Sequence, residues 1–109
     1  MTTVRLRELN GGCLFSCEGH AGYAPPGRDI VCAGVSALCI ALVRRLEEMA
    51  LEGIVRLPEC EVGAGEVRLR VETDENDKMS EILLRNTFAA IMAGFGALEE
   101  NYAENVMIT

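Results

Sequence analysis

The sequence has no tryptophan, one histidine and three prolines among its 109 residues. It also lacks an apolar run of the roughly 20 residues that a membrane span needs, because its longest run, Ile30–Val43, is short and is interrupted by Gly34 and Ser36. The first twelve residues alternate charged and apolar side chains and contain no hydrophobic signal core. We therefore expect a cytoplasmic protein that neither enters a membrane nor passes through one.

Positive charge is scarce. Ten Lys and Arg residues face 17 Asp and Glu residues, which gives a formal net charge of -7. An acidic surface repels nucleic acid, whose binding proteins carry basic patches, and attracts basic proteins or peptides. The composition therefore predicts no direct nucleic-acid contact and favours a basic partner.

The five cysteines show neither a disulfide framework nor a C-x-x-C pair, and their number is odd. Free thiols in a reducing compartment are the simplest interpretation. A zinc site built from Cys13, Cys17, His20 and Cys32 is disfavoured, because Cys13 and Cys17 would stand about 13 Å apart along one strand. Zinc ligands must all lie within about 2.3 Å of the metal. We expect no metal and no cofactor.

Residues 1–109 suit one domain, since half of them are hydrophobic and no linker divides them. Periodicity predicts an α+β fold in the order ββαββα with a possible short last strand. Its sheet should be antiparallel or mixed and packed by two long helices. The expected strands are Thr3–Arg7, Cys13–Glu18, Ile54–Val62, Glu66–Thr73 and Val106–Ile108, and the expected helices are Ile30–Glu52 and Met79–Asn101.

Three local features refine this layout. The alternation of the first strand fails at Glu8, so the strand should end about there. Pro58 places its strand at a sheet edge. The middle of the second helix, Ala89–Ala97, is apolar on nearly every side, which indicates contacts on two faces and a homodimer. Ile82 and Leu83 are counted among the apolar positions of this helix.

His20 and Cys32 form the one pair suited to chemistry. Asp29 is a good N-cap, so Cys32 should lie in the first helical turn, where unpaired N–H groups favour a thiolate. A nearby imidazole would take the thiol proton. The first-turn amides, with Ala33 and Gly34 as candidates, would stabilise an oxyanion. Gly34 would also leave room for a substrate backbone.

Each feature has a plainer interpretation. A lone cysteine in an apolar helix is usually a core residue, and this holds more strongly for Cys39, deep in the same apolar run. Cys60, in a strand, suggests no function. From spacing alone the pairing of His20 with Cys32 is the less common case, because many chains contain both residue types.

The residues around the pair also allow two interpretations. Asp29 either caps the helix, which we favour, or orients His20 as a third catalytic member. Ser36 either bonds near the site or bonds back to its own helix. The Gly- and Pro-rich segment 19–29 is either a plain connection or a lid over an extended peptide. Its candidate substrate-contacting residues are Gly22, Tyr23 and Gly27.

The motif Gly19-His20-Ala21, followed by Asp29-Ile-Val-Cys-Ala-Gly-Val-Ser-Ala37, resembles the ribosomal-processing cysteine proteases of the Prp family. The likeness extends to the ββαββα order and to the tail at residues 99–106. It implies a nucleophile at Cys32, a base at His20, and supporting positions at Asp29 and Ser36.

The same resemblance implies a homodimer that removes the N-terminal extension of a large-subunit ribosomal protein, the twenty-seventh in the standard naming. Two features depart from the family pattern: the Pro-Pro pair in the loop and the short C-terminus. They bear on peptide preference and lid motion rather than on the catalytic pair. A non-catalytic ribosome-assembly or ribosomal-protein binding module is the main alternative, and a thiol redox protein is a weaker one.

Overall fold

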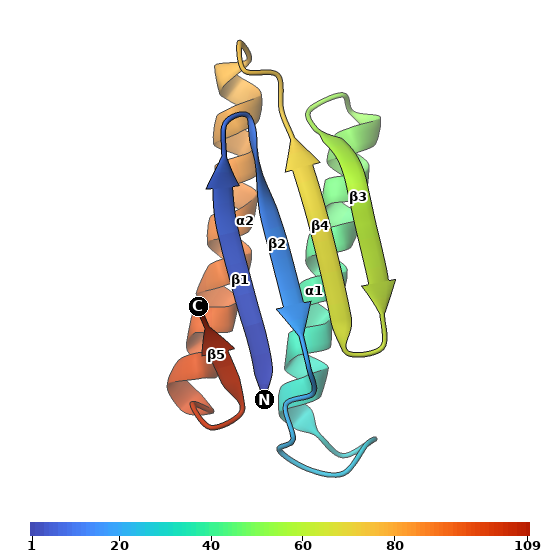
Figure 1. Cartoon of the computed structure of the whole chain (residues 1–109), viewed down its shortest axis with the longest axis vertical. Helices are drawn as coiled ribbons and strands as arrows, with labels where there is room; N and C mark the ends of the chain where they lie inside the picture. Colours follow the sequence, from blue (N-terminus) through green and yellow to red (C-terminus); the bar gives the residue numbers. More distant parts are fainter.

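The computed structural model describes all residues from 1 to 109 and consists of two layers. Both helices cover one face of a five-stranded sheet, and the other face is open (Figure 1). The elements are β1 (Thr2–Leu9), β2 (Gly12–Glu18), α1 (Ile30–Leu51), β3 (Arg56–Gly63), β4 (Glu66–Glu72), α2 (Lys78–Asn101) and β5 (Val106–Ile108). The predicted α+β order is confirmed, and it includes the short last strand.

The sheet is mixed, with the strand order β3-β4-β2-β1-β5. Only β1 and β5 run parallel; the other neighbours are antiparallel. Strand β1 ends at Leu9, within one residue of Glu8 where the alternation fails, and extends two residues beyond the expected bound at Arg7, with Glu8 paired to Cys13 and Leu9 to Gly12. Strand pairing thus holds two residues that break the apolar alternation. Pro58 lies on the edge strand, where the register shifts between Arg56 and Glu59, as its lack of an N–H requires.

The core fills the space between the sheet and the helices. Alternate strand residues point into it, as period-two patterning predicts. Phe15 of β2 lies at its centre and packs against Phe88 and Phe95 of α2, with ring centroids 5.9 and 6.0 Å apart. The buried stripe of α1 consists of Val31, Val35, Cys39, Leu42, Leu46 and Met49.

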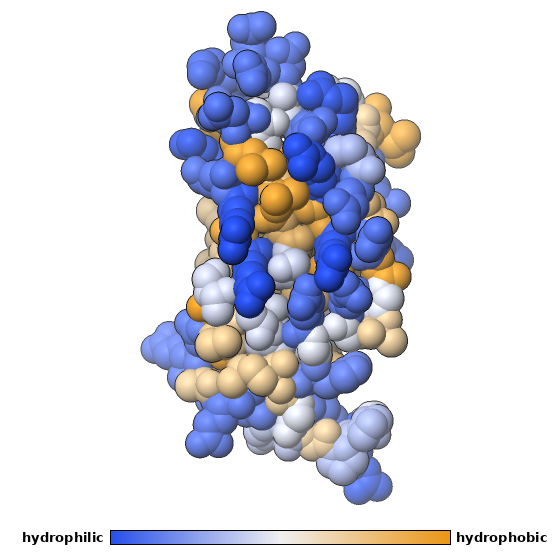
Figure 2. Space-filling model, in the orientation of Figure 1, coloured by the Kyte–Doolittle hydropathy of each residue, from blue (hydrophilic) through white to orange (hydrophobic).

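The open face of the sheet is more polar. It presents arginines that pair with neighbouring glutamates, as Arg68 does with Glu18 and Glu66. Figure 2 shows an apolar patch in the upper half of this face, bordered by hydrophilic side chains. Leu14 lines a shallow depression of about 280 Å³ there, between Arg5 and Arg7 of β1 and Arg68 of β4.

Helix α2 buries less of its apolar surface than its sequence suggests. Ile82 and Leu83 are 52% and 37% exposed, while Leu84 is buried in their place. The helix turns its Leu84–Phe88–Phe95 stripe to the sheet, so its other apolar residues face outward. By length and composition alone, α2 would be able to cross a membrane.

Candidate active site

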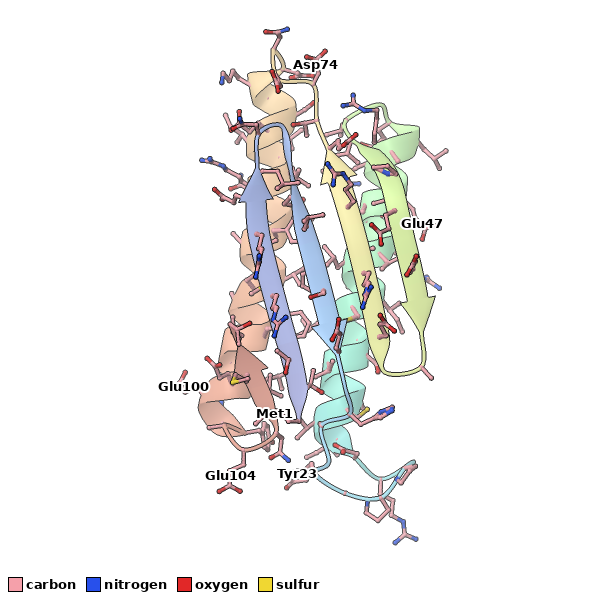
Figure 3. All side chains as sticks on the ribbon, viewed as in Figure 1. Met1, Tyr23, Glu47, Asp74, Glu100 and Glu104 are labelled. Atoms are coloured by element: carbon pink, nitrogen blue, oxygen red, sulfur yellow. The ribbon has the colours of Figure 1, made fainter.

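The sequence-predicted site residues gather at one end of the molecule. His20 follows β2 by two residues, and Cys32 is the third residue of α1. The end of β2, segment 19–29, the start of α1 and the β3–β4 turn all lie toward this end (Figure 1). Met1 and Tyr23 lie there too (Figure 3). The fold therefore brings the segments that carry His20 and Cys32 to a common region, although no hydrogen bond joins the two side chains.

His20 is exposed, and its backbone is held on two sides. The Met1 amino group donates a hydrogen bond to the His20 carbonyl at 2.7 Å. The preceding residue, Gly19, donates its N–H to the Gly65 carbonyl at 2.8 Å. The imidazole itself lies against Gly65, in the turn between β3 and β4. An exposed imidazole on a fixed backbone is suited to exchange protons with a substrate.

Cys32 is half-buried in the first turn of α1. The preceding Val31 is buried and anchors this turn to the core. The Cys32 N–H donates to Asp29 Oδ1 at 2.9 Å. A thiol so placed lies at the positive end of the dipole of a 22-residue helix, a setting that favours a negative charge on sulfur.

Asp29 is the N-cap of α1, as predicted. Its second oxygen, Oδ2, accepts hydrogen bonds from the N–H groups of Tyr23 at 2.9 Å and Ala24 at 3.3 Å. These backbone hydrogen bonds, that from Cys32 first, hold the pKa of the Asp29 carboxyl below its ordinary value. No hydrogen bond reaches His20. The geometry thus supports a cap that also ties down the loop, rather than a third catalytic member.

Segment 19–29 is attached to the C-terminal end of α2 as well. The ring of Tyr23 meets Tyr102 edge to face, with centroids 5.4 Å apart. Asn105 Nδ2 donates to the carbonyl of the buried Ala21 at 3.0 Å. These roles of Tyr102 and Asn105 were not predicted. Both residues lie in the tail at residues 99–106, and its resemblance to the family pattern was the available signal.

The two amides proposed for the oxyanion are not free. The Ala33 N–H donates to the Asp29 carbonyl at 3.0 Å. Gly34 is the fifth helical residue, beyond the amides that lack helical partners. Its α-carbon faces Leu98 of α2, so the space it leaves is used for helix packing and not for substrate. With Asp29 as the cap, the N–H groups without helical partners are those of residues 29–32, and the two predicted residues lie just beyond them.

Ser36 is exposed and makes no hydrogen bond, either to the site or back to its helix. Neither of the two roles considered for it has a contact in this structure. Gly22 and Gly27 have positive φ angles of 69° and 86° and open space around their α-carbons. They shape the loop, since few other residues adopt that backbone conformation.

None of the remaining cysteines is a better candidate nucleophile than Cys32. Cys39 is buried in the core, as predicted, where its thiol meets that of Cys17. A hydrogen bond to Cys39, together with burial, raises the pKa of Cys17. Burial also raises the pKa of Cys13, to about 12. Cys60 is exposed on the edge strand β3. The buried thiols of Cys13 and Cys17, whose pKa values are raised, are therefore poor nucleophiles.

A cavity of about 350 Å³ lies between the β1–β2 hairpin and α2. Leu6, Cys13, Phe88 and Met92 are among its lining residues, and neither His20 nor Cys32 lines it. A large apolar pocket is the usual first candidate for an active site. Here the predicted pair, His20 and Cys32, lies elsewhere and the one lining cysteine, Cys13, is buried with a raised pKa, so the cavity is not the candidate site.

Comparison with known proteins identifies the family of the chain. The family model described as cysteine protease Prp matches residues 1–107. The ribosomal processing cysteine protease Prp of Bacillus subtilis (strain 168) is 26% identical over 108 residues, which cover 98% of this chain and 93% of that protein.

Solved structures agree with the fold. The essential ribosomal processing protease Prp of S. aureus, in complex with a covalently linked product peptide, superposes with a TM-score of 0.77 at 24% identity. The alignment covers 100% of this chain and 98% of that one. SMU.848 from Streptococcus mutans gives a TM-score of 0.69 at 27% identity, covering 100% and 92% of the two chains. Because the family model matches nearly the whole sequence, the chain belongs to the Prp family of cysteine proteases.

Proposed function

We propose that the chain is a cysteine endopeptidase in which Cys32 is the nucleophile and His20 the general base and acid. Its substrate is the N-terminal extension of a large-subunit ribosomal protein, the twenty-seventh, which it removes in the cytoplasm during ribosome maturation. The observation that carries the proposal is the placement of Cys32 in a capped first helical turn, at the end of the molecule where His20 is held.

The chemistry is acyl transfer. Cys32 Sγ attacks the carbonyl carbon of the scissile peptide bond, and the positive end of α1 stabilises the oxyanion that forms. His20 donates a proton to the leaving amine as the C–N bond breaks, which leaves a thioester on Cys32. Water then attacks the thioester while His20 takes its proton. The C–S bond breaks and the thiolate is restored.

Proton transfer requires an imidazole nitrogen of His20 to come within hydrogen-bond reach of Cys32 Sγ, which is about 2.6–3.2 Å between the heavy atoms. Catalytic hydrogen bonds are commonly long before substrate binds and tighten in the complex. His20 can meet this requirement because its backbone is fixed and its exposed ring, which lies against Gly65, reaches the proton-transfer geometry without a change of the backbone.

The proposal of a peptide substrate has two supports. The S. aureus relative was crystallised with a substrate peptide and with a covalently linked product peptide. The acidic surface of this chain suits a basic ribosomal protein, and Glu100 and Glu104 lie at the end where Tyr23 marks the loop (Figure 3).

We also propose that two copies of the chain associate through α2. The outward side of this helix carries exposed Met79, Ile82 and Leu83 next to its alanine-rich middle. A contiguous apolar surface of this kind is uncommon on a monomer and marks an interface.

The deciding experiment is mass spectrometry of the N-terminally extended ribosomal protein after incubation with wild type, Cys32→Ala, His20→Ala or Cys60→Ala. Cys60→Ala is the matched control, because it removes an exposed thiol outside the site. We expect one new N-terminus with wild type and Cys60→Ala, and intact precursor with the other two. Intact precursor in all four samples, with precursor bound to wild type, would favour the binding or assembly module instead.

A further inference from the structure

Gly65, in the turn between β3 and β4, makes two contacts with the segment that carries His20. Its carbonyl accepts the Gly19 N–H at 2.8 Å, which extends the β2–β4 pairing one step beyond Glu18 and Glu66. Its α-carbon lies against the imidazole. A β-carbon at position 65 would stand 2.9 Å from both Cε1 and Nε2 of His20.

Such a β-carbon would displace the ring rather than the fold. Non-bonded carbon atoms pack at about 3.5–4.0 Å, so the imidazole would have to move by roughly 0.5–1 Å. His20 is exposed, and its ring is the free end of a side chain that can swing into solvent. Apart from the backbone penalty that any side chain incurs at the positive φ of Gly65, the fold would therefore accommodate the change, while the position of the imidazole would be lost.

We propose that Gly65 is a positioning residue that sets the place of the His20 imidazole for proton transfer, an inference that depends on the proposed function. The bare α-carbon provides a surface against which the ring rests, and the carbonyl fixes the backbone that leads to it. A misplacement of about 1 Å costs up to roughly 100-fold in rate. Gly65→Ala should therefore lower kcat by about 10- to 100-fold.

The chain offers a matched control for the backbone cost. Gly65 has φ +72°, which a residue with a side chain rarely adopts, and Gly53 has φ +76° with nothing within 4 Å of its added β-carbon. Gly53 follows α1 at the far end of the molecule (Figure 1). Gly53→Ala thus carries the same conformational penalty without touching His20. Gly65→Asn serves as a second test variant, because asparagine tolerates positive φ better but still adds a β-carbon.

Two measurements test the inference. Cleavage kinetics of the extended precursor should show a loss of kcat with little change of KM in Gly65→Ala and Gly65→Asn, and near wild-type values in Gly53→Ala. In NMR spectra the His20 Hε1 signal is unambiguous, because the chain has a single histidine. It should show a nuclear Overhauser effect to the Gly65 α-protons in wild type and a changed chemical shift in both Gly65 variants only.

The outcomes separate the two proposals. If wild type cleaves and the Gly65 variants match Gly53→Ala in kcat, the inference is overturned and the protease stands. The absence of the Hε1–Gly65 Overhauser effect in folded wild type would also overturn it, without any variant. A wild type that cleaves no precursor refutes the proposed function, and the inference falls with it.

Discussion

Gly94 of α2 and Leu38 of α1 are packed so closely that a β-carbon on Gly94 would stand 2.6 Å from Leu38 Cδ2. One turn away the pairing is reversed, and Gly34 of α1 faces Leu98 of α2. Each helix thus offers a glycine to a leucine of the other. Since interiors have little free volume, these two contacts set the separation of the helices. They fix the start of α1, and therefore Cys32, relative to the end of α2 that holds the loop.

Gly94→Ala should destabilise the fold. The added methyl group overpacks against Leu38, which costs roughly 1–3 kcal/mol in the free energy of unfolding. Gly96→Ala, in the same helix, has nothing within 4 Å of its added β-carbon and should gain about 0.5–1 kcal/mol from helix propensity. Urea unfolding of the two variants measures both values. Equal urea midpoints for the two variants would show that the close Gly94–Leu38 contact does not affect the free energy of unfolding.

Asp29→Ala should lower both stability and activity. It removes the cap of α1 and frees the amides of Tyr23 and Ala24, so the loop loses its connection to the helix. Asp77→Ala is the control, since Asp77 caps α2 through Ser80 in the same way but lies far from the site. The two variants should melt at similarly reduced temperatures, and only Asp29→Ala should lose cleavage, by roughly tenfold or more. Full activity of a folded Asp29→Ala protein would contradict this role.

The same carboxyl predicts a dependence of stability on acid. The pKa of Asp29 is lower in the folded chain than in the unfolded one, because backbone N–H groups bind the carboxylate. Its stabilisation is therefore complete above the unfolded-state pKa, about 3.9, and is lost as the pH falls through the lower folded value. Melting temperatures measured between about pH 2 and 6 should decline more steeply for wild type than for Asp29→Asn below about pH 4. Parallel curves would exclude a contribution from Asp29.

The sequence predicted the bounds of the helices and strands well, and the contacts between different elements less well. Strand alternation and the Asp29 cap are local features, so β2 and the start of α1 were placed within one residue. What periodicity cannot specify is which neighbour an element meets. The contact of Gly65 with His20 depends on the β2–β4 register, between residues that lie 45 positions apart in the chain, and no local pattern encodes it.

Two predictions failed for different reasons. Ile82 and Leu84 both fit an apolar helical stripe, and only the rotation of α2 against the sheet decides that Leu84 is buried. The Ala33 amide was considered free although the predicted cap at Asp29 already gives it a helical partner, the Asp29 carbonyl four residues before it. Contacts between distant elements therefore required the structure, whereas the position of the unpaired amides follows from the cap itself.

Ile82→Glu should abolish the association proposed for α2. Ile82 is 52% exposed on the outward side of the helix, so a buried charge would arise only if a second copy covers it. Val62→Glu is the control, because Val62 is 61% exposed on the edge strand β3. Light scattering after size-exclusion chromatography should give half the wild-type mass for Ile82→Glu alone. A wild type that already elutes as a monomer would rule the association out.

Alkylation with iodoacetamide should distinguish Cys32 from every other thiol. Cys13, Cys17 and Cys39 are buried and should react only after unfolding. Cys60 is exposed, but burial of its sulfur and the charge of Glu47 raise its pKa, so it stays protonated and reacts slowly near pH 7. Cys32 should therefore be modified first in peptide maps near neutral pH, whereas Cys60 should react as fast only in alkaline solution, where its thiol also loses its proton. In His20→Ala the advantage of Cys32 should shrink, because the imidazole no longer accepts the thiol proton. If Cys60 reacts first at pH 7 in the folded wild type, Cys32 lacks the activation that the proposed nucleophile requires.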